Sequence, residues 1–104
     1  MAVAFQALTF DFDESKGAIQ ELEDTASFGR RIRVAEAVLQ TFDVLYTRVD
    51  AELHRFMIFI DVVDVDESAG NVRVRVRYLL RDKSGNIDDP FRGRITAIVI
   101  ADTV

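Results

Sequence analysis

The strictest pattern in the chain is an alternation of apolar and charged side chains between Asn71 and Leu80. The apolar set is Val72, Val74, Val76, Tyr78 and Leu80, and the intervening charged set is Arg73, Arg75 and Arg77. A repeat of two residues places one set on one face of a β-strand, whereas the repeat of an α-helix is 3.6 residues. This segment therefore predicts a strand with one face on a core.

The preceding segment, Arg55 to Val65, is rich in β-branched and aromatic residues, which favour strands. A polar loop, Asp66 to Gly70, joins it to the strand that starts at Asn71, and the loop has the length of a hairpin connection. The two segments are predicted to form an antiparallel hairpin. We expect Asp61 to lie near Arg75, so that the arginine stripe forms a solvated ladder of charges in preference to a site for an anionic sugar, a phosphate or an acidic protein.

Two further strands are predicted nearer the ends of the chain. The first contains Leu8, Phe10 and Phe12 in alternation and ends within residues 13–17, with a short continuation through Ala18 to Leu22. The last spans Gly93 to Asp102 and is apolar on both faces. One of its faces carries Ile95, Ala97, Val99 and Ala101, and the other carries Thr96, Ile98 and Ile100.

The segment from Arg31 to Tyr46 fits two structures. Val34, Ala35, Val38 and Leu39 make a helical stripe, but alternation is also present along the segment, in Ile32, Val34, Val38, Phe42 and Val44. Its flanks have the composition of extended structure, which favours a strand. The alternative is one short helix packed on an antiparallel sheet, which would make the fold α+β.

These segments predict an all-β fold, an antiparallel β-sandwich of six or seven strands, in one domain spanning residues 1–104. The composition, with 49% apolar and 30% charged residues, is that of an ordinary globular domain. Arg55 to Val65 is apolar on both faces: Phe56, Ile58, Ile60 and Val62 alternate with Met57, Phe59, Val63 and Val65. Because one face of a sandwich strand meets the core, the other face predicts cover by copies of the chain in a homo-oligomer.

Composition also argues against several classes of function. The chain has no cysteine and one histidine, His54, which excludes thiolate chemistry and disfavours a zinc site. A net charge of −5 disfavours nucleic acid, and the longest apolar run, Phe56 to Ile60, is too short to cross a membrane as a helix. No phosphate-binding loop, nucleophile elbow or secretory signal is legible, and carboxylate pairs such as Asp64 with Asp66 are interpreted as solvated charges. The sequence predicts a protein that is not an enzyme and does not indicate its location.

The connection from Leu80 to Gly93 holds the most distinctive string of polar residues. Oxygen-bearing side chains recur at every second position, in Asp82, Ser84, Asn86 and Asp88, as in loops that bind calcium. Its glycine is fourth instead of sixth, no glutamate follows at the twelfth place, and Lys83 opposes a cation. We therefore interpret these side chains as caps of turns and not as calcium ligands. The sequence predicts no cofactor.

The order of segments from about Arg31 to the C-terminus resembles that of H-type lectin domains. The likeness rests on Arg33–Leu39 followed by Phe42-Asp43-Val44, on the hairpin, and on a last strand that closes with Ile98–Ala101. The resemblance implies a six-stranded β-sandwich that forms trimers or hexamers and binds sugars between subunits. No sugar-binding residue is carried over by a motif. Residues 55–82 also look like the small baseplate-wedge domain of contractile phage tails, a structural α+β module.

Together these observations predict a non-catalytic binding module that acts as a homo-oligomer and takes a carbohydrate or protein ligand. Charged loops on a rigid sheet are common binding sites, and one connection concentrates arginine, aspartate, asparagine and an aromatic residue that we expect to be exposed. The candidate ligand-binding residues are Arg81, Asp82, Asn86, Asp88, Asp89, Phe91 and Arg92. The alternative is a structural assembly subunit, such as a phage tail or baseplate component, with no small ligand.

Overall fold

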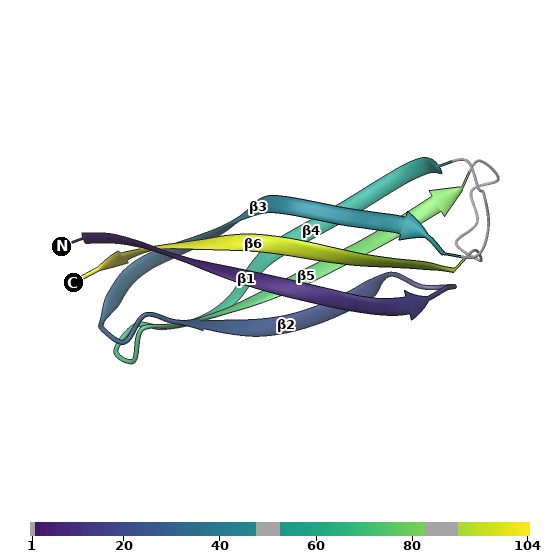
Figure 1. Cartoon of the computed structure of the whole chain (residues 1–104). Helices are drawn as coiled ribbons and strands as arrows, with labels where there is room; N and C mark the ends of the chain where they lie inside the picture. The colour runs from purple at the N-terminus through teal and green to yellow at the C-terminus, as the bar shows by residue number, and fades with distance from the viewer. Residues whose placement is uncertain (1, 48–52, 83–89) are drawn as a thin grey trace.

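A computed structural model describes residues 2–47, 53–82 and 90–104, which form six strands and no helix. The strands are β1 (Ala2–Ser15), β2 (Gln20–Ser27), β3 (Ile32–Tyr46), β4 (Leu53–Asp66), β5 (Asn71–Asp82) and β6 (Phe91–Thr103). They make two antiparallel three-stranded sheets in the orders β1-β6-β3 and β2-β5-β4, packed face to face (Figure 1). The predicted antiparallel β-sandwich is confirmed.

The molecule is elongated, measuring 50 × 18 × 18 Å. Its strands run along the long axis, so the start of β1 and the end of β6 lie together at one end (Figure 1). The central strands β5 and β6 are flanked on both sides and supply most of the core, because every inward side chain along them is covered by the opposite sheet. The inward sets are Val72, Val74, Val76, Tyr78 and Leu80 from β5, and Phe91, Ile95, Ala97, Val99 and Ala101 from β6.

The hairpin of β4 and β5 forms in the register expected from the sequence. Asp61 is paired with Arg75, and the alternation of β5 points its apolar residues inward and its arginines outward. One expectation for β4 is wrong. A register shift between Val62 and Asp64 turns Val65 inward, where it pairs with Val72 and packs on the core. The second apolar face of β4 is therefore shorter than the uninterrupted alternation indicates.

The ambiguous segment is a strand, β3, along its whole length. It pairs with β6 from Ile32, opposite Thr103, to Tyr46, opposite Phe91. Two register shifts, one between Ile32 and Val34 and one between Leu39 and Thr41, change which residues face inward. A strand whose alternation changes phase twice loses the simple period of two, which explains why its apolar residues also fitted a helical stripe.

Aromatic rings fill the core at the end of the molecule away from the termini. The Tyr78 ring lies in edge-to-face contact with Phe12, at 4.6 Å between centroids, and with Phe91, at 5.4 Å. These three residues come from β5, β1 and β6, so the cluster joins the two sheets. Such contacts stabilise a core beyond the area that they bury.

Candidate binding site

The outer face of the β1-β6-β3 sheet is divided into bands that run across the strands. Inward and outward side chains alternate along β6, so its outward set is Arg92, Arg94, Thr96, Ile98, Ile100 and Asp102. Residues paired with these on β1 and β3 project on the same side. The end near the termini is apolar, the middle is a row of Thr9, Thr96 and Thr41, and the far end is charged.

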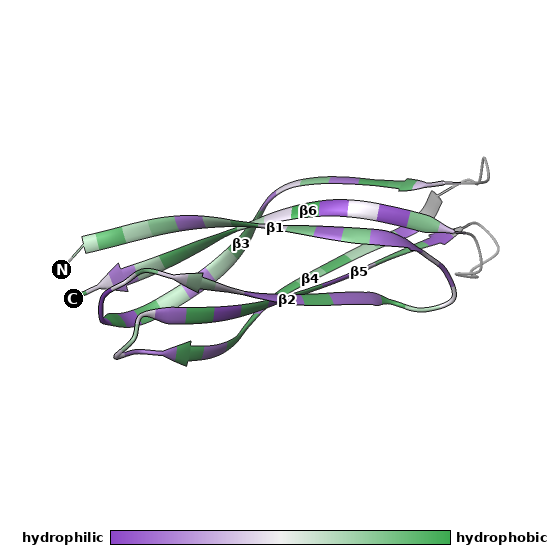
Figure 2. Cartoon of the chain, turned by 60° about the horizontal axis from the view of Figure 1, so that its bottom comes forward, coloured by the Kyte–Doolittle hydropathy of each residue, from purple (hydrophilic) through white to green (hydrophobic). Residues whose placement is uncertain are grey.

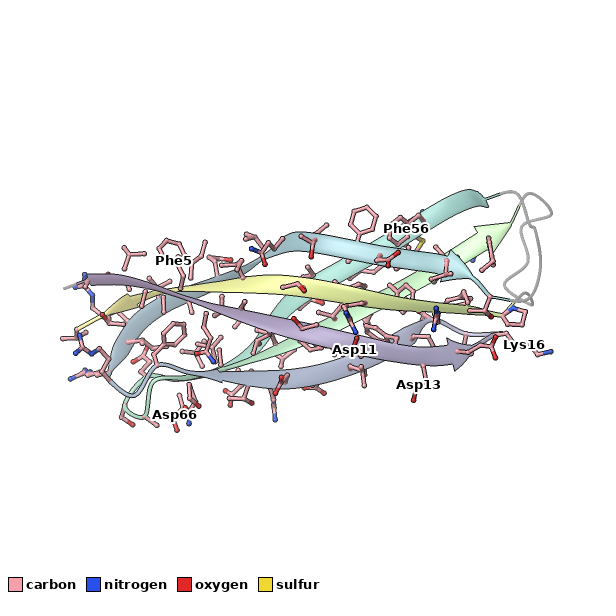
Figure 3. The ribbon with its side chains drawn as sticks, viewed as in Figure 1. Phe5, Asp11, Asp13, Lys16, Phe56 and Asp66 are labelled. Carbon is pink, nitrogen blue, oxygen red and sulfur yellow. The ribbon has the colours of Figure 1, made fainter. Side chains whose placement is uncertain are left out.

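The charged end holds a shallow depression, which we call the polar pocket. Its volume is about 520 Å³, and it is lined by side chains of all three strands over a floor of Phe12 and Gly93. The lining side chains are Asp11, Asp13 and Glu14 of β1, Asp43 and Leu45 of β3, and Arg92 and Arg94 of β6. Figure 3 shows Asp11 and Asp13 on β1, in the half of the molecule opposite Phe5.

Strand pairing explains how these charges come together. Arg94 is paired with Asp11 on one side and with Asp43 on the other, so a guanidinium lies between two carboxylates. The Nε atom of Arg94 donates a hydrogen bond of 2.6 Å to the Asp11 carboxylate. That hydrogen bond and the negative charge of Asp11 raise the pKa of Arg94 above its ordinary value, and Asp43 adds to the effect. Arg94 is therefore a cation hydrogen-bonded to Asp11 on the exposed surface of the sheet.

A smaller depression of about 360 Å³ adjoins the polar pocket and shares Glu14, Leu45 and Arg92 with it. Its fourth lining residue is Thr47, whose hydroxyl donates a hydrogen bond to the Glu14 carboxylate. The backbone N–H of Thr47 also donates to the carbonyl of Pro90, at 3.0 Å. These bonds connect the ends of β1 and β3 with the start of β6, so the edge of the pocket is supported by three parts of the chain.

The arginine stripe on the other sheet is neutralised from both neighbouring strands. Asp61 of β4 lies 3.4 Å from Arg77 and 3.7 Å from Arg75, and the Arg77 guanidinium lies 5.0 Å from the centre of the Phe59 ring. On the β2 side, Glu23 lies 3.4 Å from Arg73. The predicted ladder of charges is confirmed, and these arginines are engaged by the protein's own carboxylates.

The structure separates the predicted site residues that it describes. Arg81 projects from the outer face of the β2-β5-β4 sheet, and Arg92 projects from the outer face of the β1-β6-β3 sheet into the polar pocket. The expected exposure of Phe91 is wrong: the residue is 0% exposed, because its position on β6 turns it inward against Tyr78. Asn86, Asp88 and Asp89 lie outside the described residues, as do Ser84 and the side chain of Asp82. The prediction about calcium binding by these side chains therefore also lies outside the described residues.

Sequence reasoning missed most of the polar pocket. Asp11 lies between Phe10 and Phe12, and Asp43 lies between Phe42 and Val44, so each is the polar member of an apolar alternation. That alternation indicates that both are outward-facing. It does not indicate that both flank Arg94, because their pairing joins strands far apart in the chain.

The part of the chain that the structure describes has no metal-binding cluster. No group of three or more histidine, cysteine, aspartate or glutamate side chains there is placed to hold a metal ion. The described residues form no helix, and so none that is long and apolar enough to cross a membrane. The side chain of His54 is outside the described set.

Comparisons with known proteins identify no relative of this chain. No protein-family model, no curated protein and no solved structure matches the chain significantly. The class that the fold defines is the antiparallel six-stranded β-sandwich.

Proposed function

We propose that this chain is a non-catalytic binding module that takes a neutral carbohydrate in the polar pocket and acts as a homo-oligomer. The observation that carries the proposal is the mixed lining of the pocket, in which carboxylates of two strands flank the guanidinium groups of a third. The described side chains form a shallow, open surface, which suits a ligand that remains partly in water.

The chemistry of the lining favours hydroxyl groups as ligands. An ionised carboxylate accepts hydrogen bonds at two oxygens, and a guanidinium donates several in a planar fork, so the two together suit the neighbouring hydroxyls of a sugar. The pocket has four carboxylates, from Asp11, Asp13, Glu14 and Asp43, and two guanidinium groups. This excess of negative charge disfavours phosphate and anionic sugars, and Leu45 offers an apolar contact for a sugar ring.

The lining gives less support to catalysis. Asp11, Asp13 and Asp43 are exposed to solvent, whereas a carboxyl that acts as a general acid usually lies in apolar surroundings that keep it protonated near neutral pH. The sandwich fold is consistent with the resemblance to H-type lectins, which implies sugar binding by an oligomer. The proposed site consists of charged residues of this chain, and none of them is carried over from the sugar-binding residues of H-type lectins.

Glycan-array binding followed by calorimetry tests the proposal. Arg92→Ala and Asp43→Asn are expected to weaken binding of any glycan that the wild-type protein selects by at least tenfold. Arg30→Ala is the matched control, because Arg30 is an exposed arginine in the β2–β3 connection, outside the pocket, and its loss should leave the affinity unchanged. A wild-type protein that binds no glycan, or pocket variants with unchanged affinity, would reject the carbohydrate site.

A second candidate is a structural assembly subunit with no small ligand. The apolar end of the outer face of the β1-β6-β3 sheet favours it, because large hydrophobic side chains are exposed there. A neighbouring subunit could bury them without any small ligand. An oligomer that binds no sugar on the array would support this second function.

A further inference from the structure

The apolar end of the β1-β6-β3 sheet has no cover within the described chain. We call it the apolar band, and its members are Val3, Phe5 and Ala7 of β1, Val34 and Val38 of β3, and Ile98 and Ile100 of β6. Phe5 is 67% exposed, Val3 is 63% exposed and Val34 is 57% exposed. In Figure 2 the N-terminal part of β1 is coloured mostly hydrophobic. Exposed apolar surface of this kind marks an interaction site.

The apolar band contains a projecting side chain next to a groove. Phe5 projects from the outer face near the end with the termini (Figure 3). Beside it is a groove of about 220 Å³ lined by Val3, Val34 and Ile100, and also by Glu36 and Asp102, although its exposed surface is almost entirely apolar. Since a protein cavity of roughly 150 Å³ holds a benzene molecule, this groove has room for one phenyl ring.

We propose that a second copy of this chain packs against the apolar band, with Phe5 of each copy inserted into the groove of the other. A two-fold symmetric interface must be self-complementary, so each copy has to present both the projecting group and the cavity that receives it. Phe5 and the groove meet that condition, because Ile100 in the groove is the cross-strand neighbour of Phe5. The dimer then contains the contact between Phe5 and the groove two times, once from each copy.

The charge distribution allows a copy of the chain to be the partner. The chain has a net charge of −5, so copies repel one another unless they meet at a nearly neutral surface. Within the described rows of the apolar band, the Asp102 carboxylate is paired with Arg33 at 3.0 Å, and Glu36 is the other charged residue. The carboxylates of the polar pocket lie in the other half of the face, and those of β2 lie on the opposite sheet.

The size of the apolar band limits the strength of the dimer. The apolar band extends over about five residues along each of three strands and covers roughly 17 Å by 14 Å. The interface therefore buries roughly 500 Å² in total, which is below the range of stable complexes, so the dimer is weak. We expect a dimer whose population depends on concentration. Added salt should strengthen it, because salt screens the repulsion between two acidic chains.

This inference specifies the self-association that the proposed function includes, but it does not depend on the polar pocket. Sedimentation equilibrium over a range of concentrations tests it first. The wild-type protein is expected to approach twice its mass of 11.8 kDa, and Phe5→Glu is expected to weaken association at least tenfold. Phe59→Glu is the matched control, since Phe59 is an exposed phenylalanine on the other sheet. Circular dichroism on heating shows whether each variant is folded.

A mixing experiment then tests the contact between Phe5 and the groove. Phe5→Glu removes the projecting ring, and Val34→Arg blocks the groove, so each variant alone should be monomeric. A mixture of the two should form a heterodimer, because one contact stays intact and the other places the new carboxylate opposite the new guanidinium. Native mass spectrometry distinguishes the heterodimer by its mass.

The possible failures point to different proposals. A wild-type protein that is monomeric at all concentrations, an oligomer unaffected by Phe5→Glu, or a mixture that stays monomeric would overturn this interface. A persistent oligomer after Phe5→Glu would leave self-association standing on another surface. Loss of glycan binding in Arg92→Ala with the mass unchanged would concern the polar pocket alone.

Discussion

Gly93 of β6 lies directly against the ring of Tyr78 on β5. A Cβ atom at residue 93 would be 3.1 Å from two carbons of that ring and 2.5 Å from Cγ1 of Val44. Gly93 is therefore the point where the two sheets approach each other beneath the polar pocket, whose floor it forms with Phe12.

Gly93→Ala is expected to destabilise the fold. The added methyl group has to displace an aromatic ring and a valine inside a packed core, and such overpacking costs about 1–3 kcal/mol. Urea unfolding should show a lower midpoint with an unchanged slope. A midpoint equal to that of the wild-type protein would show that the ring moves freely and that the contact is not tight.

Gly70→Ala is expected to be the most damaging of the glycine substitutions. Gly70 has a positive φ of 75°, and a Cβ atom there would overlap the carbonyl of Arg30, which belongs to the connection between β2 and β3. The same connection bonds to this turn, because the N–H of Phe28 donates to the Gly70 carbonyl at 2.9 Å. We expect a loss of more than about 2 kcal/mol in the free energy of unfolding.

Gly17→Ala is the control for that prediction. Gly17 also has a positive φ, of 87°, but a Cβ atom there meets nothing within 4 Å. Its substitution should cost only the backbone strain, about 1 kcal/mol. Equal losses in the two variants would contradict the packing of the turn against Arg30.

Stability should fall at alkaline pH because of Tyr78. Burial raises the pKa of its hydroxyl to about 12, compared with about 10 in an unfolded chain. The folded state holds the proton more tightly, so this contribution is fully present below pH 10 and is lost as the pH rises from about 10 to about 12. The slope is at most about 1.4 kcal/mol per pH unit. Thermal midpoints measured across this window test it.

Tyr78→Phe should remove that alkaline loss. The Tyr78 hydroxyl is buried and has no hydrogen-bond partner in the part of the chain that the structure describes, so its removal at pH 7 should be neutral or slightly stabilising. A variant that is clearly less stable at pH 7 would show that the hydroxyl has a partner.

Asp61→Asn should have a small effect. The Asp61 carboxylate is close to both Arg75 and Arg77, but all three side chains are partly exposed. Exposed ion pairs contribute less than about 1 kcal/mol, and salt screens them. The variant should lose a few tenths of a kcal/mol in low salt and nothing measurable in high salt. A large loss independent of salt would contradict a solvated ladder.

Much of the hairpin could be predicted from the sequence. The pairing of Asp61 with Arg75 follows from a short loop and two alternating segments, because a hairpin connects neighbours in the chain. The inward set of β6, including Ile95 and Val99, also follows from alternation. Phe91 belongs to that same inward set, but the polar residues before it masked its place on the strand.

The sequence by itself determined that the chain is extended, where its core strands lie, and which of their side chains alternate. The tertiary structure alone decided that Arg94 lies between Asp11 and Asp43, that Val65 turns inward, and that a groove opens beside Phe5. The reason is physical: alternation reports two sides of one strand, whereas neighbours across a sheet are set by pairing between distant segments. A single register shift then reverses which side meets the core.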